Sequence, residues 1–460
     1  MSGSLIQQQA DLQGLSTAIL LPSVDLFGGI SRKAVGPLTQ VVGIELFVRT
    51  VLTLQRAGIR QLIVLAGSDE DQLKQALAKG PRVTVPVRWM PMREFPLDDP
   101  RTWESLAAEA RGFCLLSGVG GVFSRPLIEQ LREDVSSGKT IVVAHDGPAG
   151  SARLSSTGHR QAETEVPAAA DLVVLPASVL SRAAEETPAP GLLPVRRWLE
   201  RASNDGNLRV MAIGKDPAAW YQGLDSAEDL RQAERKLYSS LKSEFEGFVD
   251  RYFNRKLSHW FTRAFVAAGF SPNAITIMAT FVGLTAAGLF GIGSYAAGIA
   301  GALLFQFAAV IDCCDGEVAR LTFTESPFGA WLDIAMDNVV HMAIFGGIAV
   351  GAHLQEADQS RSWLPLVLGA AAIIGNALSF TLVNRAQKIK QASGWKTPVG
   401  AAWSDFVLKN VASRDFSAIV FVFALLGKLE WFLWMAAAGS LVFACVMLWV
   451  TRPSAVALKS

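Results

Sequence analysis

The stretch IDCCDGEVARLTFTESPFGAWLDIAMDNVVH, residues 311–341, contains four aspartates and joins two long apolar segments. Asp312 and Asp315 stand near the end of one apolar segment, and Asp333 and Asp337 stand near the start of the next. Spacings of three and four residues put each pair on one face of a helix. Because the connection between the two segments is short, the helices can run antiparallel. We therefore expect the two pairs to face one another.

These acids need a partner if they lie inside a membrane. Each aspartate at mid-membrane costs roughly 2.5–3.5 kcal/mol on insertion scales, and converging carboxylates also repel one another. A divalent cation removes both costs, and a ligand set of carboxylate oxygens suits Mg²⁺ or Mn²⁺. The alternative interpretation is a proton or cation pathway in a transporter or channel.

Three further positions flank the acids. Gly316 and Gly329 permit a ligand to approach the backbone closely, although glycines also serve plain helix packing in membranes. Arg320 can bind phosphate through two parallel hydrogen bonds. Its alternative interpretation is a cation that extends to the membrane interface.

The composition of the whole chain agrees with a membrane protein. Of its 460 residues, 50% are hydrophobic and only 18% are charged, against about a quarter charged in soluble domains. A net charge of +1 excludes a globally basic nucleic-acid-binding protein. The second half contains six apolar segments, and all but the fifth have about the length of a spanning helix. These segments are 274–293, 295–319, 328–352, 363–384, 416–430 and 431–450.

Basic residues between these segments predict the orientation. The connection 385–414 is rich in lysine and arginine, and the positive-inside rule places it in the cytoplasm. With six spans, the residues before the first span and those after the last lie on that same side. We expect a multi-pass protein of the cell (inner) membrane, with residues 1–240 and the active site facing the cytoplasm. The polar N-terminus shows no cleavable signal peptide.

Residues 244–268 predict a basic amphipathic helix directly before the first span. Leu257 and Trp260 fall on its apolar face, and Ser258 and Arg263 fall on the other side. Such a helix can lie in the membrane interface. The alternative is an ordinary surface helix of the first half of the chain.

Residues 1–240 alternate short apolar runs with helix-like segments. This alternation predicts an α/β domain with an open, mostly parallel sheet, followed by an all-α membrane domain over 241–460. The expected strands are 17–21, 61–67, 111–118, 140–147, 171–176 and 208–214. The cysteines have no metal-ligand spacing, so we expect reduced packing residues. They are Cys114, Cys313, Cys314 and Cys445.

Eight positions around the acids resemble the signature of a known family. The pattern D-x-x-D-G-x-x-A-R-x8-G-x3-D-x3-D is typical of CDP-alcohol phosphotransferases, and this chain matches it without a departure. SPNAIT at 271–276 is similar to the start of the family's first span, and SRDF at 413–416 resembles a segment of some members. The matching residues are Asp312, Asp315, Gly316, Ala319, Arg320, Gly329, Asp333 and Asp337.

The resemblance implies a reaction in which a CDP-linked alcohol donates its phosphoalcohol group to the hydroxyl of an acceptor, with release of CMP. Asp312, Asp315 and Asp333 would hold two ions of Mg²⁺ or Mn²⁺ against the diphosphate. Asp337 would complete the metal site and act as the general base. The family also implies a homodimer. The CDP site would be lined by Asp312, Gly316, Ala319, Arg320 and Gly329.

The resemblance leaves the substrates open. A lipid donor such as CDP-diacylglycerol would enter between helices, whereas a soluble donor such as CDP-inositol would enter from the cytoplasm. A phosphorylated acceptor needs a cationic pocket, for which the cytoplasmic candidates are Arg255, Arg385, Lys388 and Arg414. The same cations can instead set the topology or contact anionic lipid.

The first half resembles nucleoside-diphosphate-sugar pyrophosphorylase-like nucleotidyltransferases. The likeness lies in TAILL (17–21), in GPLTQVVGIELFVRTVLTLQRAGIRQLIVLAG (36–67) and in LDSAEDLRQAERKL (224–237). Fusions of a cytidylyltransferase-like domain to a CDP-alcohol phosphotransferase are a known arrangement. They imply a first domain that makes CDP-inositol and a second that joins it to inositol phosphate.

The chain departs from the nucleotidyltransferase pattern where the chemistry is expected. Gly36 stands in place of a lysine, and the segment LLSGVGGVFS lacks the metal-binding aspartate. Asp225 is either a metal ligand or a helix N-cap. We expect a degenerate domain that stabilises, regulates or docks a partner, and the alternative is an active cytidylyltransferase in a bifunctional enzyme. The residues that still resemble the phosphate loop are Gly28, Gly29, Ser31 and Arg32.

Two other classes explain less of the sequence. An intramembrane aspartate-rich prenyltransferase also uses Mg²⁺ with diphosphates, but its two aspartate motifs lie far apart, whereas one short turn separates them here. A transporter or channel explains buried acids, but it does not explain an arginine and two glycines at this spacing.

Overall fold

The computed structural model divides into two units, Met1–Ser240 and Leu241–Ser460. The described residues are 14–22, 24, 26, 35–80, 83–110, 112–144, 169–183, 195–213, 216–241, 255–355, 363–393 and 416–450.

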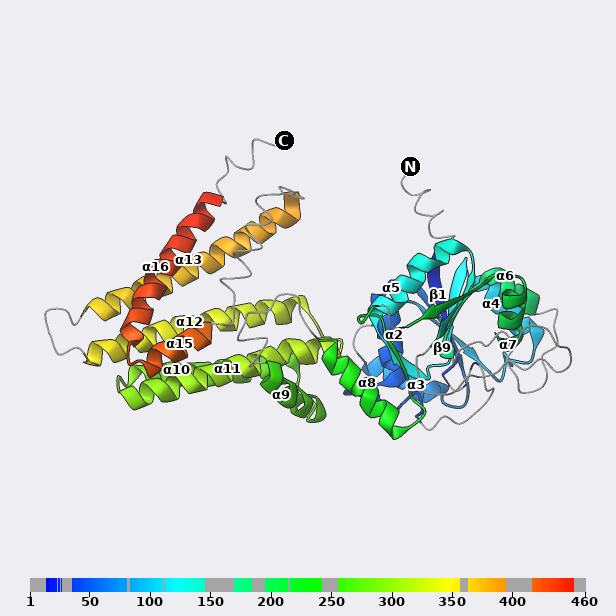
Figure 1. The fold of residues 1–460 in the computed structure, drawn as a ribbon, viewed down its shortest axis with the longest axis horizontal. Helices are drawn as coiled ribbons and strands as arrows, with labels where there is room; N and C mark the ends of the chain where they lie inside the picture. The colour runs from blue at the N-terminus through cyan, green and yellow to red at the C-terminus, as the bar shows by residue number, and fades with distance from the viewer. Residues whose placement is uncertain are drawn as a thin grey trace. The chain divides into compact units, whose positions relative to one another are not determined.

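The first unit is built on a seven-stranded sheet with the order β10-β8-β9-β6-β1-β4-β5 (Figure 1). All six strands expected from the sequence are present, and β5 adds an edge strand whose side chains are mostly half-exposed. Four of the six pairings are parallel, and β9 runs antiparallel to both β6 and β8. The strands are β1 Leu15–Leu20, β4 Gln61–Ala66, β5 Val87–Pro91, β6 Phe113–Ser117, β8 Thr140–Ala144, β9 Ala169–Pro176 and β10 Leu208–Ala212.

Helices and two short antiparallel strand pairs complete the described part of this unit. Helices α4, α6 and α7 share one apolar cluster with the sheet, on the side opposite α2 and α5 (Figure 1). The helices are α2 Leu46–Arg56, α3 Glu70–Lys79, α4 Pro100–Glu109, α5 Arg125–Asp134, α6 Ala177–Ala183, α7 Val195–Asn204 and α8 Ala227–Ser239, with a 3-10 turn at Val135–Ser137. The small pairs are β2 Gln40–Val41 with β3 Ile44–Glu45, and β7 Gly121–Phe123 with β11 Tyr221–Gly223.

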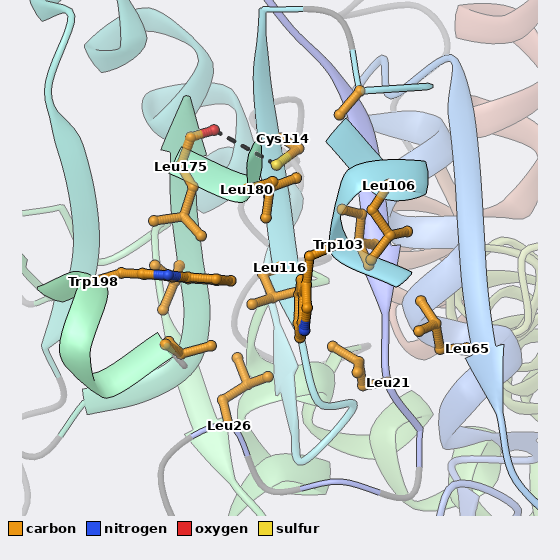
Figure 2. Packing of buried hydrophobic residues seen from close by; sticks show 14 of the residues in the cluster. Leu21, Leu26, Leu65, Trp103, Leu106, Cys114, Leu116, Leu175, Leu180 and Trp198 are labelled. Atoms are coloured by element: carbon orange, nitrogen blue, oxygen red, sulfur yellow. Dashed lines mark hydrogen bonds between the residues drawn. The ribbon is translucent and has the colours of Figure 1, made fainter. Parts of the chain in front are cut away.

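The apolar cluster of the first unit centres on two tryptophans. The rings of Trp103 on α4 and Trp198 on α7 meet edge to face, with centroids 5.1 Å apart (Figure 2). Beside them the Cys114 thiol donates to the carbonyl of Leu175 at 3.5 Å (Figure 2), and burial raises its pKa to about 12. A thiol in that state is inert packing. All four cysteines are free, as expected, although Cys445 is exposed.

The second unit is a bundle of helices, and five of them are long and apolar enough to cross a membrane. Among the six expected spans the exception is the fifth, where the ten-residue helix α15, at about 15 Å, is shorter than the roughly 30 Å of a bilayer core. The expected count of six spans is therefore not confirmed over the described residues. The helices are α9 Arg255–Ala267, α10 Pro272–Gly291, α11 Tyr295–Leu321, α12 Pro327–Gln355, α13 Leu364–Ser393, α15 Phe416–Leu425 and α16 Leu429–Val450.

Glycines let α10 and α12 approach closely. A Cβ added at Gly347 would run into the carbonyl oxygen of Ala287, and one added at Gly351 would run into that of Phe290. Small residues of this kind permit backbone contact between membrane helices, where no hydrophobic effect pulls the helices together. Helix α10 also packs along α11 (Figure 1). It therefore holds the two helices that carry the aspartates.

Helix α9 corresponds to the second half of the amphipathic helix expected over 244–268, whose residues 244–254 lie outside the described residues. The face of α9 that is buried differs from the expected apolar face. Ser258 and Thr262 are fully buried, whereas the Trp260 side chain is 75% exposed. Ser258 does lie on the side of the helix opposite Trp260, but it is this polar side that is buried. The reason is a buried acid on α11 that binds these hydroxyls.

Candidate active site

The end of α11 and the start of α12 bring three aspartates together. Asp312, Asp315 and Asp333 each offer a carboxylate oxygen, and these atoms all lie within 4.8 Å of one another. Asp312 and Asp315 are buried, and Asp333 is half-buried. Asp337 lies one turn further along α12 and is half-buried, outside this group. The acids of the two helices thus converge as expected, but three of the four aspartates form the group.

Short-range sequence signals produce this arrangement. Helix α11 ends in a turn in which the Thr324 amide donates to the carbonyl of Ala319 at 3.0 Å. Ser326 then begins α12, because its Oγ accepts the Gly329 amide at 3.0 Å, and Pro327 is the first helical residue. A Ser-Pro start of this kind is favourable because the cap satisfies a terminal amide and proline lacks one. The turn is short enough to keep the acids of both helices at one level.

Helix α10 supports the group from a third direction. The Thr276 hydroxyl donates to Oδ2 of Asp315, which orients this carboxylate. A Cβ added at Gly329 would lie 3.2 Å from Oδ1 of Asn273 and 3.1 Å from Oγ of Ser326. Glycine at this position therefore lets the first turns of α10 and α12 lie close together beside the acids.

The remaining signature residues surround the acids on α11. Arg320 is exposed, and its guanidinium lies over Gly316, where an added Cβ would be 3.3 Å from Nη1. Ala319 is buried. Small residues at 316 and 319 thus leave room for an arginine that folds back toward the acids. A guanidinium in that place can bind a phosphate through two hydrogen bonds.

The electrostatics of the group favour a cation. Two carboxylates at 4.8 Å repel by about 3 kcal/mol per pair at an effective dielectric constant of about 20, and this group contains three such pairs. Its donors are all carboxylate oxygens, which is the ligand chemistry of Mg²⁺ and Mn²⁺. The residues present therefore fit the divalent cation expected from the sequence.

Several predicted site residues cannot be placed. The side chains of Arg255, Arg385 and Lys388 lie outside the described residues, as does the whole of Arg414. In the first unit, the candidate phosphate-loop residues Gly28, Gly29, Ser31 and Arg32 also lie outside them. These assignments stay predictions.

Sequence reasoning missed three polar residues next to the acids. Glu317 is buried on α11, and both of its oxygens accept hydrogen bonds from α9. The donors are Ser258 Oγ at 3.0 Å and Thr262 Oγ1 at 2.6 Å. The sequence did contain a signal for this contact. A glutamate stands inside an apolar segment, and two hydroxyl residues stand four apart on the amphipathic helix that precedes it.

The first unit has a different carboxylate where a metal-binding aspartate was expected. The turn after β6 contains Gly118 and Gly120, and the Gly120 amide donates to Oδ2 of Asp171, on β9, at 2.8 Å. A Cβ added at Gly118 would lie 2.6 Å from this same oxygen. The buried Asp171 thus holds the turn. The N-cap of α8 is Ser226, in a capping box with Asp229, so an N-cap role for Asp225 is wrong.

Comparison with known proteins agrees with this site. Residues 270–456 match the family model of CDP-alcohol phosphatidyltransferase. This part of the chain, which contains the three aspartates, is therefore a domain of that family.

Two relatives carry the same printed name, bifunctional IPC transferase and DIPP synthase. The protein from Aquifex aeolicus is 30% identical over 162 residues, which are 35% of this chain and 35% of that protein. The chain thus spans about a third of that relative's length. The protein from Rubrobacter xylanophilus is 28% identical over 363 residues, 73% of this chain and 77% of that protein. Because the second unit is less than half of the chain, this alignment reaches into the first unit.

Solved structures resemble each half. A Mycobacterium tuberculosis phosphatidylinositol phosphate synthase in complex with manganese and citrate is 21% identical, covering 43% of this chain and 91% of its own, with a TM-score of 0.33. The nucleotidyltransferase-like neighbours of the N-terminal region include 4-diphosphocytidyl-2C-methyl-D-erythritol synthase from Anaerococcus prevotii. It is 14% identical and covers 49% of this chain and 99% of its own, with a TM-score of 0.36.

Proposed function

We propose that the second unit is a membrane enzyme that transfers a phosphoalcohol group from a CDP-alcohol to the hydroxyl of an acceptor, in the synthesis of phospholipids or polar headgroups. The observation that carries this proposal is the group of three aspartates across α11 and α12, inside the segment that matches the family. In the reaction, the acceptor oxygen forms a bond to the phosphorus that bears the alcohol. The bond from that phosphorus to CMP breaks, and CMP leaves.

The proposed cofactor is Mg²⁺ or Mn²⁺, as two ions, held by Asp312, Asp315 and Asp333. When bound, the metal neutralises the charge that develops on the departing CMP. The chain's own residues position the reactants: Arg320 binds a phosphate of the donor, and the small residues Gly316 and Gly329 leave space for it. Positioning and charge stabilisation supply most of the catalysis in phosphoryl transfer.

Asp337 is the proposed general base. It lies one helical turn from Asp333 and outside the group of three, so its carboxylate can accept the proton of the acceptor hydroxyl. We assign Asp337 to this role and the other three aspartates to the metal.

The proposed setting is the cell (inner) membrane, with the site and the first unit on the cytoplasmic side and the protein as a homodimer. The basic residues Arg255, Arg385, Lys388 and Arg414 are the proposed contacts for a phosphorylated acceptor. The five long apolar helices support a multi-pass membrane protein.

The first unit has two candidate roles. We favour a degenerate domain, because the turn after β6 contains no aspartate and is held by Asp171 instead. The second candidate is an active cytidylyltransferase that supplies the CDP-alcohol. It is favoured by the Rubrobacter relative, which is named as bifunctional and whose alignment reaches into the first unit.

The deciding experiment is a CMP-release assay on the purified chain in liposomes. CDP-diacylglycerol and CDP-inositol are each offered with inositol phosphate, glycerol phosphate, serine or inositol, in Mg²⁺ or Mn²⁺. We expect release with at least one pair and none with Asp312→Asn. A chain that binds metal but releases CMP with no pair would contradict the proposed function.

A further inference from the structure

Glu317 is a buried acid that the family signature does not specify. It lies two residues after Asp315 on α11, and only 5% of its surface is exposed. A buried carboxylate is costly unless hydrogen-bond donors surround it. Its donors therefore matter for how α11 is placed.

Both donors come from one face of α9. Ser258 and Thr262 are four residues apart and fully buried. Ser258 Oγ donates to Oε1 at 3.0 Å, and Thr262 Oγ1 donates to Oε2 at 2.6 Å. Because each oxygen has its own donor, the carboxylate of Glu317 is held in two directions. We call these three residues the hydroxyl clamp.

Other contacts place α9 along the same part of α11. The Cys314 thiol lies 3.6 Å from the carbonyl oxygen of Ser258, and the rings of Phe261 and Phe307 meet edge to face at 5.5 Å. In the sequence, Phe307 precedes the two aspartates, Cys314 lies between them and Glu317 follows them. Helix α9 thus follows the segment that carries two of the metal-site acids.

Helix geometry relates the clamp to those acids. An α-helix turns about 100° per residue, so Glu317 points almost opposite to the mean direction of Asp312 and Asp315. The clamp therefore contacts the side of α11 that faces away from the two aspartates, whereas Thr276 binds Asp315 itself. Rotation of α11 would break the clamp and would also move both aspartates away from Asp333.

We infer that the hydroxyl clamp positions α11 so that Asp312 and Asp315 converge with Asp333 on a divalent cation. Ser258, Thr262 and Glu317 are positioning residues, and they touch neither the cation nor the substrate. This inference rests on the metal role given to the aspartates in the proposed function. It also explains why α9 turns hydroxyls inward and leaves Trp260 outside.

The test measures Mn²⁺ binding directly, on the full chain in detergent without substrates, from the electron paramagnetic resonance signal of free Mn²⁺. Thr262→Val and Glu317→Gln should each weaken binding about tenfold, as loss of supporting contacts does at other metal sites. Thr262→Ser keeps the hydroxyl and should bind as the wild type does. Thr285→Val is the matched control, since the Thr285 hydroxyl bonds only within α10, to the carbonyl of Phe281.

Unfolding temperatures in EDTA separate positioning from folding. The inference is supported if Thr262→Val and Glu317→Gln bind Mn²⁺ more weakly while their unfolding temperatures without metal equal that of the Thr285→Val control. It is overturned if Thr262→Val and Glu317→Gln bind Mn²⁺ normally, if Thr262→Ser is as weak as Thr262→Val, or if the wild type binds none. CMP release is assayed separately, so a chain that binds Mn²⁺ without turnover contradicts the proposed function alone.

Discussion

The Thr276 hydroxyl on α10 donates a hydrogen bond to Oδ2 of Asp315 on α11. Both residues are buried. The bond orients one of three converging carboxylates from a helix that carries none of them. A threonine in the first span is thus part of the support of the metal site.

Replacement of Thr276 by valine should weaken Mn²⁺ binding, because Asp315 loses the group that orients it. Supporting residues of this kind typically contribute 10–100-fold in metal affinity, and we expect about tenfold. Thr280→Val is the matched control, since the Thr280 hydroxyl bonds to the Thr276 carbonyl one turn earlier. Equal Mn²⁺ affinity of the two variants would contradict the role of Thr276.

Removal of a carboxylate should have opposite effects with and without metal. Asp333→Asn relieves repulsion within the group of three, so its unfolding temperature in EDTA should exceed that of the wild type. A ligand at 100 times its Kd stabilises a protein by about 2.7 kcal/mol, and this gain with Mn²⁺ should vanish in the variant. Thermal unfolding with and without Mn²⁺ measures both effects. Asp205→Asn, in an exposed turn of the first unit, is the control, and a metal-induced shift retained by Asp333→Asn would show that the site lies elsewhere.

Asp337→Asn separates the base from the ligands. A general base contributes about 10²–10⁴-fold to rate, so CMP release should fall at least 100-fold while Mn²⁺ affinity stays near that of the wild type. If Asp337→Asn releases CMP at the wild-type rate, Asp337 is not the general base. Loss of Mn²⁺ binding would instead make Asp337 a ligand.

The contact of α10 with α12 should tolerate no side chain at Gly347. Gly347→Ala puts a Cβ against the carbonyl of Ala287, and overpacking of this kind costs about 1–3 kcal/mol. Gly288→Ala, on the facing helix with nothing within 4 Å of its added Cβ, should be neutral or slightly stabilising, because alanine favours helix over glycine. Thermal unfolding in detergent compares the two, and equal stability would mean that the helices are further apart.

The first unit should release no pyrophosphate. We expect the full chain, incubated with CTP, Mg²⁺ and inositol phosphate, to give only the background seen with Asp225→Asn. The reason is that the turn after β6 holds Asp171 against its backbone and contributes no carboxylate of its own. CTP-dependent pyrophosphate release that Asp225→Asn abolishes would establish the bifunctional alternative.

Much of this architecture follows from periodicity alone. Apolar runs of strand length predicted six strands of the first unit, and all six are present. Their directions were not all predictable: β9 runs antiparallel to its neighbours, because a strand's sequence does not record which partner it joins. The short strand β5 was missed since only Met90 of its side chains is buried, which leaves no apolar run to detect.

The number of spans shows the same limit. The segment 416–430 is apolar from Ala418 to Leu426, yet its helix α15 ends at Leu425 and Gly427 adopts a positive φ of 64°. Apolar composition specifies burial in protein or lipid but does not specify a continuous helix. Length and composition therefore predicted five of the spans, whereas the fifth segment, 416–430, forms a helix too short to count as one.

By itself, the sequence determined that Asp312 and Asp315 share one helix face and that a short turn brings Asp333 back toward them, because helical spacing is a local property. Only the tertiary structure decided which face of each helix meets a partner. It left Asp337 outside the group of three and turned Ser258 inward. The physical reason is that a buried charge needs partners, and those partners come from distant parts of the chain.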